Sequence, residues 1–254
     1  MKNIAIIPAR MSSSRFPGKP MKDINGIPMI GHCYFRARLC KSLDQVYVAT
    51  CDDEIFDYIS SIGGKAIMTS KKHERASDRT AEALYKIEKS LREKFDVVVM
   101  LQGDEPMVTP NMIDKSLEPF KDKNVEVVNL YSKITNMDEY QDPNEVKVVL
   151  DKYGDAIYFS REPIPSSKKG AKNFDIFKQV CVIPFRRKAL MDFNDLEETP
   201  LEIIESVDMM RIIENGKKVR MVKIEEDSYS VDVKADLDKV VKLMKTDLLV
   251  DSYN

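Results

Sequence analysis

The sequence predicts an α/β domain with a mostly parallel sheet and helices on both of its faces. Residues 4–7 and 96–101 are almost wholly apolar runs, as expected of strands that are buried on both sides. Helical patterns separate such runs over the first two thirds of the chain. This βαβα order makes successive strands parallel, because a helical crossover returns the chain to the same edge of the sheet.

The N-terminal elements follow from apolar spacing and from the residues that end helices. Residues 29–39 place apolar side chains at helical intervals, and residues 77–94 predict a longer helix. Asp52 or Asp53 is positioned to cap a further helix, which Gly63 and Gly64 would end. The strands expected here are 4–7, 45–50, 66–68 and 96–101.

Beyond Pro106 the pattern changes to shorter strands with polar connections. We expect a loop at 163–172, which is rich in proline, serine and lysine, and helices at 200–214 and 235–245. The strands expected here are 125–132, 146–150, 156–159, 178–185 and 219–224. The 254 residues suit a single domain, in which residues 155–200 form a candidate dimerisation or substrate-side subregion.

Composition excludes several classes of protein. The formal net charge of −2 favours neither nucleic acid nor a membrane surface as a partner. No apolar run approaches the ~20 residues that span a bilayer, and residues 4–7 suit a first strand better than a signal peptide. Four cysteines without CxxC spacing and only two histidines disfavour a zinc site or a disulfide framework. A cytoplasmic location is the default expectation.

The loop after the first strand carries the strongest chemical signal. Residues 8–20 supply Arg10, Arg15 and Lys19 among small residues that include Ser13 and Gly18. Ligands of parallel sheets bind beyond the carboxyl ends of the strands, and small residues let backbone N–H groups approach phosphate oxygens. The loop matches neither a P-loop nor a dinucleotide fingerprint. Three cations directly after a buried strand favour phosphate binding over an ordinary solvated basic loop.

Two acidic residues are candidates for a metal site. Asp104 follows the apolar run 96–101, and Asp232 lies in a similar apolar context near the C-terminus. A carboxylate at the sheet edge can hold a magnesium ion that bridges nucleotide phosphates. Spacing alone leaves Asp104 equally well explained as a helix cap, and a lone late aspartate such as Asp232 is more often a cap or a surface group.

Several motifs together resemble the bacterial CMP-sugar-acid synthetases, and among them the 3-deoxy-manno-octulosonate (KDO) cytidylyltransferase, or CMP-KDO synthetase, family. The resemblance covers nearly the whole chain. It is carried by IIPARMSSSRFPGKPMKDINGIPMIGH, VATCDDEI, LQGDEP, DPNEVKVVLDKYGDAIYFSREPIP, TPLEIIE and SVDVKADL. It implies a Rossmann-like sheet of the nucleotide-diphospho-sugar transferase type with a small dimerisation region, and a homodimer.

The resemblance also implies roles for individual residues. Arg10, Lys19 and Asp104 would be catalytic, and Asp104 and Asp232 would bind Mg²⁺. The residues expected to bind the nucleotide are Ala9, Arg10, Ser13, Arg15, Lys19 and Gln102. Those expected to bind the sugar are Arg75, Arg79, Arg161, Gln179 and Glu202.

The implied reaction is attack of the anomeric hydroxyl of a 2-keto sugar acid on the α-phosphorus of CTP, with release of pyrophosphate. Such an enzyme would act in lipopolysaccharide or capsule synthesis. Its work would be positioning and charge neutralisation, so no cysteine or serine nucleophile is needed.

Three departures from the family pattern fall on the sugar side. Arg75 and Ala76 replace a serine–glycine pair, Gln179 stands near the place of a histidine, and Met209 replaces a polar residue. Polar groups of a pocket decide which hydroxyls it accepts, so a different 2-keto-3-deoxy sugar acid, such as 8-amino-8-deoxy-KDO, is an alternative acceptor. A second alternative is a catalytically inactive nucleotide-binding module.

Overall fold

The computed structural model describes residues 1–12, 15–170 and 174–253. Its contacts divide the chain into two compact units. Unit 1 comprises Met1–Asp114 and Ser228–Asn254, and unit 2 comprises Lys115–Asp227. Within the described residues, no helix is both long and apolar enough to cross a membrane.

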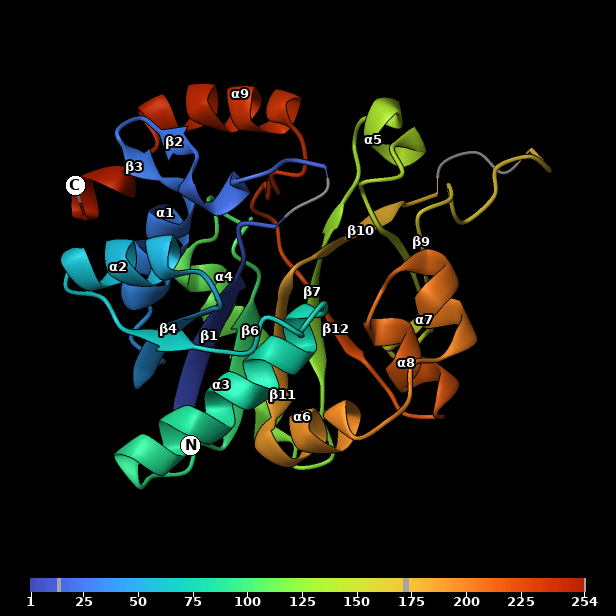
Figure 1. The fold of residues 1–254 in the computed structure, drawn as a ribbon. Coiled ribbons are helices and arrows are strands. Elements are labelled where there is room, and N and C mark those ends of the chain that lie inside the picture. The colour runs from blue at the N-terminus through green and yellow to red at the C-terminus, as the bar shows by residue number, and fades with distance from the viewer. Residues whose placement is uncertain (13–14, 171–173, 254) are drawn as a thin grey trace. The chain divides into compact units, whose positions relative to one another are not determined.

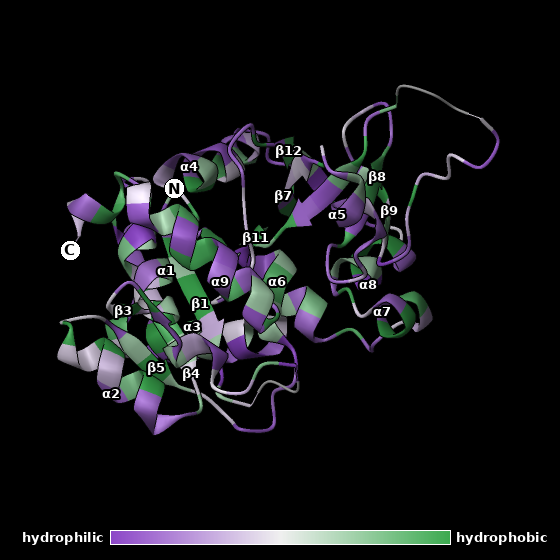
Figure 2. Ribbon diagram, turned by 90° about the horizontal axis from the view of Figure 1, so that it is seen from above, coloured by the Kyte–Doolittle hydropathy of each residue, from purple (hydrophilic) through white to green (hydrophobic). Residues whose placement is uncertain are grey.

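Unit 1 is built on parallel strands in the order β6 (Val97–Leu101), β1 (Asn3–Ala9), β4 (Gln45–Thr50) and β5 (Ala66–Met68) (Figure 1). Every residue of β1 and β6 is buried, as their apolar runs predict. Figure 2 shows β1 in the hydrophobic colour, whereas α2 (Asp53–Ser61) alternates between hydrophobic and hydrophilic residues. The predicted parallel α/β fold is confirmed.

The helices of unit 1 begin and end close to the predicted positions. They are α1 (Met29–Arg38), α2, α3 (Ala76–Leu91) and α9 (Lys234–Leu243). Helix α3 ends earlier than expected because Arg92 adopts a left-handed conformation with φ of 54°. Asp52 lies at the N-cap of α2, but its side chain does not cap the helix.

The C-terminal segment of unit 1 returns to the beginning of the chain. A short hairpin of β2 (Asp23–Ile24) and β3 (Ile27–Pro28) follows η1 (Lys19–Met21), and α9 packs beside it (Figure 1). Ile24, Met29, Val231, Val240 and Met244 form one buried cluster, against which Phe16 of the first loop also packs. The chain ends with η3 (Met244–Thr246) and η4 (Val250–Ser252).

Unit 2 contains a mixed sheet with the strand order β12-β7-β10-β8-β9. These strands are β7 (Val128–Lys133), β8 (Lys147–Leu150), β9 (Ala156–Ser160), β10 (Phe177–Val180) and β12 (Arg220–Lys223). Only β12 and β7 pair in parallel; the other pairs are antiparallel. The expected single strand 178–185 is wrong, because Cys181 separates β10 from β11 (Val182–Arg186).

The helices of unit 2 are short. They are α5 (Met137–Gln141), α6 (Arg187–Asn194), α7 (Pro200–Glu205) and α8 (Met209–Glu214), with the turn η2 (Glu118–Lys121). Helix α4 (Pro110–Leu117) spans the boundary between the units. The single helix expected at 200–214 is wrong, since Ser206 has a φ of 52° and ends α7. Residues 155–200 lie in unit 2, and their part in dimerisation stays a prediction.

Candidate active site

The first loop is shaped by two glycines at the carboxyl end of the sheet in unit 1. Gly18 has a φ of 70°, which an L side chain rarely adopts, and its N–H donates to the carbonyl of Met11 at 3.0 Å. Gly103 follows β6, and a Cβ there would lie 3.0 Å from the carbonyl oxygen of Pro8. The turn after β6 can therefore approach the end of β1 closely, which brings Asp104 to the loop that carries Lys19.

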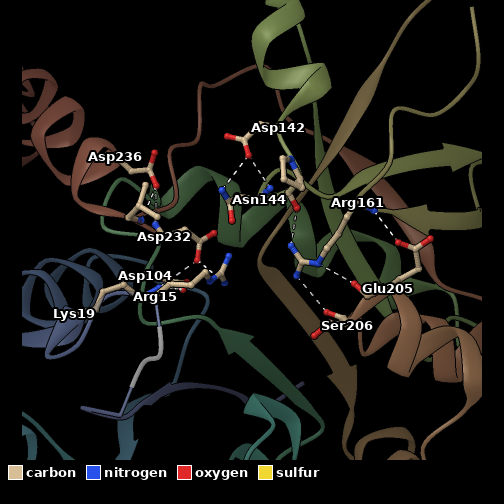
Figure 3. A network of polar contacts seen from close by, with 12 residues as sticks. Arg15, Lys19, Asp104, Asp142, Asn144, Arg161, Glu205, Ser206, Asp232 and Asp236 are labelled. Atoms are coloured by element: carbon tan, nitrogen blue, oxygen red, sulfur yellow. Dashed lines mark hydrogen bonds and ion pairs between the residues drawn. The ribbon is translucent and has the colours of Figure 1, made fainter.

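Lys19 is the centre of the site. Its Nζ lies 2.7 Å from Asp104 Oδ2 and 3.5 Å from Asp232 Oδ1, and its side chain is only 12% exposed. Arg15 Nη2 approaches Asp232 Oδ1 at 2.9 Å from a more exposed position. Figure 3 shows these four side chains directed toward one another. The structure thus brings together a cation pair and a carboxylate pair that the sequence places far apart.

Burial and charge together set the protonation of this cluster. Burial by itself would lower the pKa of Lys19, but the charges of Asp104 and Asp232 outweigh it and raise that pKa. Burial raises the pKa of Asp232, and the nearby charge of Asp104 raises it further, against the opposing effect of Lys19 and Arg15. Two carboxylates crowded in this way are stabilised by any additional cation between them.

The fixed geometry of the first loop depends on a residue outside it. Asp52 Oδ2 accepts a hydrogen bond from the Met11 N–H at 2.8 Å. Asp52 follows β4, so the ends of β1 and β4 hold the start of the loop between them. The sequence pattern offers Asp52 or Asp53 as a helix cap and does not predict this contact, whose one sequence signal is an acid just after a strand.

The other residues expected near the nucleotide lie at the same strand ends. Ala9 is the buried last residue of β1, and Arg10 follows it half-buried. Gln102 follows β6, and its carbonyl accepts from the Glu105 N–H at 3.2 Å to close the turn that presents Asp104. Ser13 lies outside the described residues. Within the described residues, neither Arg10 nor Gln102 takes part in the ion pairs that join Arg15, Lys19, Asp104 and Asp232.

Two residues expected on the sugar side lie near the start of α3 in unit 1. Arg79 is buried, and its guanidinium donates to Thr69 Oγ1 at 2.5 Å and to the carbonyl of His73 at 3.1 Å. It therefore braces the segment that leads from β5 into α3. Arg75 occupies the N-cap position of α3. The sugar-binding role of both residues stays a prediction.

Arg161 of unit 2 links a loop to a helix end. Its guanidinium donates to the carbonyls of Pro143 and Glu205, each at 2.9 Å, and its N–H donates to Glu205 Oε2 at 2.9 Å (Figure 3). Lys147 is fully buried beneath it and donates to the Arg161 carbonyl at 2.6 Å. Arg161 is thus held in a single orientation by several partners.

Gln179 and Glu202 also lie in unit 2 and have close partners. Gln179 Nε2 donates to Asn129 Oδ1 at 2.5 Å. Both carboxylate oxygens of Glu202 accept from the Arg211 guanidinium at 2.6 Å, and Glu202 is completely buried. These contacts support the local fold, and the expected roles of both residues in sugar binding stay predictions.

Oxygens of Asp104 and Asp232 converge on Lys19 in unit 1 and are candidate metal donors. No group of three or more histidine, cysteine or acidic side chains with metal-binding geometry occurs among residues 1–12, 15–170 and 174–253. A pair of carboxylates suits Mg²⁺, which binds through one or two carboxylates and completes its shell with water and phosphate oxygens. The donor chemistry of this pair therefore fits the expected ion.

Known proteins that are similar in sequence to this chain are cytidylyltransferases. The family model described as cytidylyltransferase matches residues 4–219. A 3-deoxy-manno-octulosonate cytidylyltransferase of Thermodesulfovibrio yellowstonii is 41% identical, over 97% of this chain and 99% of its own. One from Geobacter metallireducens is 38% identical, over 95% and 97%.

Solved structures agree with these relatives. A CMP:2-keto-3-deoxy-manno-octonic acid synthetase complexed with CTP superposes with a TM-score of 0.88 at 37% identity, covering 98% of this chain and 100% of the other. A 4-diphosphocytidyl-2C-methyl-D-erythritol synthase of Anaerococcus prevotii has a TM-score of 0.62 at 13% identity, covering 96% and 99%. The second likeness speaks for the fold alone.

Proposed function

Because this chain belongs to the cytidylyltransferase family, we propose that it transfers CMP from CTP to KDO and releases pyrophosphate. The observation that carries the proposal is the cluster of Lys19 with Asp104 and Asp232 at the carboxyl end of a parallel sheet. Relatives that are about 40% identical over nearly their full length are named for this reaction. A solved relative with a TM-score of 0.88 is complexed with CTP.

The proposed reaction forms one bond to phosphorus and breaks another. The anomeric hydroxyl of KDO attacks the α-phosphorus of CTP and loses its proton to water, the bond from that phosphorus to the bridging oxygen breaks, and pyrophosphate leaves. Lys19 would neutralise charge on the phosphates, and Arg15 would do so from the more exposed side. The first loop would hold the triphosphate in one orientation, because Gly18 and the Asp52 contact fix its backbone.

We further propose that Asp104 and Asp232 hold Mg²⁺. When bound, the ion would offset the negative charge that the reaction moves onto pyrophosphate. Lys19 Nζ lies between the same two carboxylates, at 2.7 and 3.5 Å. Lys19 would then be free to turn toward the triphosphate once the ion balances the carboxylates.

The test is to incubate the protein with CTP, Mg²⁺ and KDO and to measure pyrophosphate, with reactions that omit KDO as the control. Release that depends on KDO is expected. A panel of nucleotides and of 2-keto-3-deoxy sugar acids, including 8-amino-8-deoxy-KDO, would locate the preferred pair. Release with another acid alone would replace KDO as acceptor and leave the reaction class standing.

A nucleotide-binding module without activity is the second candidate. It would bind CTP and release no pyrophosphate with any acid of the panel. The joint presence of Lys19, Asp104 and Asp232 in contact disfavours this candidate, since a protein that only binds nucleotide has no need for a pair of metal ligands. We also propose a homodimer in the cytoplasm; sedimentation equilibrium would reveal the dimer, and a single monomeric species would contradict it.

A further inference from the structure

The segment that carries Asp232 is anchored to the turn that carries Asp104. Ser228 Oγ donates to Glu105 Oε2 at 2.8 Å, and both side chains are buried. Three residues later, the Val231 N–H donates to the carbonyl of Asp104 at 2.9 Å. The chain is thus fixed on the N-terminal side of Asp232 by one side-chain bond and one backbone bond.

The chain is also anchored on the C-terminal side of Asp232. The carboxylate of Asp236, in the first turn of α9, accepts from the N–H groups of Asp232 and Val233, each at 2.9 Å. Figure 3 shows Asp236 beside the backbone of Asp232 and directed away from Lys19. Asp236 therefore contacts the backbone of the candidate ligand and does not enter the Lys19 cluster.

Anchors on both sides matter because the two carboxylates repel each other. Asp104 and Asp232 share the largely buried ammonium group of Lys19, which lies 2.7 Å from one carboxylate and 3.5 Å from the other. A carboxylate on an unrestrained strand would relieve this repulsion by moving away, and a cation would then have to pull it back. Partners that orient metal ligands keep them in place before the ion arrives.

We propose that Ser228 and Asp236 are positioning residues that hold Asp232 opposite Asp104 for a divalent cation. The inference rests on the proposed function, because it presumes that the carboxylate pair binds the ion. Ser228 acts through Glu105, and Asp236 acts through the backbone of Asp232. Neither side chain touches the cation itself.

The experiment measures Mn²⁺ binding to the full-length protein by electron paramagnetic resonance, with α,β-methylene-CTP present so that no turnover occurs. We expect Asp236→Ala to weaken Mn²⁺ binding by about 10- to 100-fold, the usual effect of removing a partner of a metal ligand. Asp238→Ala is the matched control, because Asp238 lies on the same helix and pairs with the exposed Lys234. Binding by Asp236→Ala as tight as by Asp238→Ala would overturn the proposal.

Rescue variants separate positioning from general damage to the fold. Ser228→Thr keeps the hydroxyl and is expected to bind Mn²⁺ within about 3-fold of the unmodified protein, whereas Ser228→Ala loses about 10-fold. Asp236→Asn keeps an acceptor oxygen and is expected to lie between Asp236→Ala and the unmodified protein. Equal loss in Ser228→Thr and Ser228→Ala would show that the hydroxyl has no such role.

Steady-state kinetics provide the second readout. The Mg²⁺ concentration at half-maximal rate is expected to rise in Asp236→Ala, while KM for CTP at saturating Mg²⁺ changes less than about 2-fold. A parallel rise in both would indicate a damaged fold and overturn the positioning role. If the unmodified protein and Asp104→Asn bind Mn²⁺ equally, the metal site of the proposed function fails instead, and that outcome is distinct from failure of the positioning role.

Discussion

Each unit of the chain contains a cluster of buried charges, and the two clusters differ in how completely their charges are paired. In unit 1, Asp104 and Asp232 share Lys19, and their side chains are 21% and 16% exposed. In unit 2, the Arg211 guanidinium and Glu202 carboxylate form two bonds of 2.6 Å, and their side chains are 3% and 0% exposed. Only the first cluster keeps carboxylate surface that a ligand could reach.

A charged residue can bind a substrate only if its donors or acceptors are not all used within the fold. Arg211 also donates to the carbonyl of Leu196 at 3.2 Å, and it lies over the Phe193 ring at 4.4 Å. Its donors are used within unit 2, so its pairing with Glu202 contributes to the fold. The Lys19 cluster keeps part of its two carboxylates exposed, and both of them share Lys19, so a bound cation could replace the lysine as their partner.

The largest expected effect is on stability in unit 2. Glu202→Ala removes the carboxylate that makes two bonds of 2.6 Å with the buried Arg211, and we expect the free energy of unfolding to fall by about 3–5 kcal/mol in urea denaturation. The double variant Glu202→Met with Arg211→Leu should regain much of this loss, because an apolar pair needs no compensating charge. Unchanged stability together with a raised KM for KDO would instead make Glu202 a sugar ligand, as the family resemblance implies.

The next effect is on turnover in unit 1. Asp104→Asn keeps the shape of the turn but removes one charge of the carboxylate pair, and we expect kcat to fall on the order of 10²- to 10³-fold. The fold should persist, because Lys19 retains Asp232 as a partner. Asp57→Asn, at an exposed acid of α2, is the control. Full activity in Asp104→Asn, measured as pyrophosphate release, would refute its role at the metal.

Local sequence patterns were enough to predict the parallel strands of unit 1. Their residues are apolar without interruption, so β1 and β6 were expected within one or two residues of their bounds. The break between α7 and α8 was missed because apolar residues continue on both sides of Ser206. Arg161 donates to the Glu205 and Ser206 carbonyls at the end of α7. Because Arg161 is distant in the sequence, the spacing of residues near Ser206 does not indicate this contact.

The sequence predicted the residue types of the candidate site, but not the hydrogen bonds that hold those residues in place. Cations after β1 and an acid after β6 identify the sheet edge, and the family resemblance singles out Asp232. The Ser228–Glu105 bond joins distant segments, and no periodicity relates them. The role of Asp236 could be predicted from the sequence, because an acid in the first turn of a helix often accepts hydrogen bonds from the backbone N–H groups at the start of that helix.

Tyr253, His32 and Arg36 form a small hydrogen-bonded network in unit 1, for which we expect a structural role alone. The Tyr253 hydroxyl accepts from Arg36 Nε at 3.0 Å and donates to His32 Nδ1 at 2.9 Å, since His32 Nε2 must donate to the Ile24 carbonyl. Tyr253→Phe should lower the free energy of unfolding by about 1–2 kcal/mol in urea denaturation, because it removes both bonds of the hydroxyl. Turnover should stay within about 2-fold; a loss of activity without a loss of stability would contradict a purely structural role.

The smallest expected effect is a pH dependence of stability that arises from Asp232 in the Lys19 cluster. Burial and the charge of Asp104 raise the pKa of Asp232 above its value in the unfolded chain. Protonated Asp232 therefore favours the folded state, and this contribution is lost as pH rises through the raised pKa. Asp232→Asn cannot ionise, so its stability relative to the unmodified protein should increase between pH 3 and pH 7 when chelator is present. Unfolding free energies measured across that range would run in parallel for the two proteins if Asp232 were an ordinary surface acid.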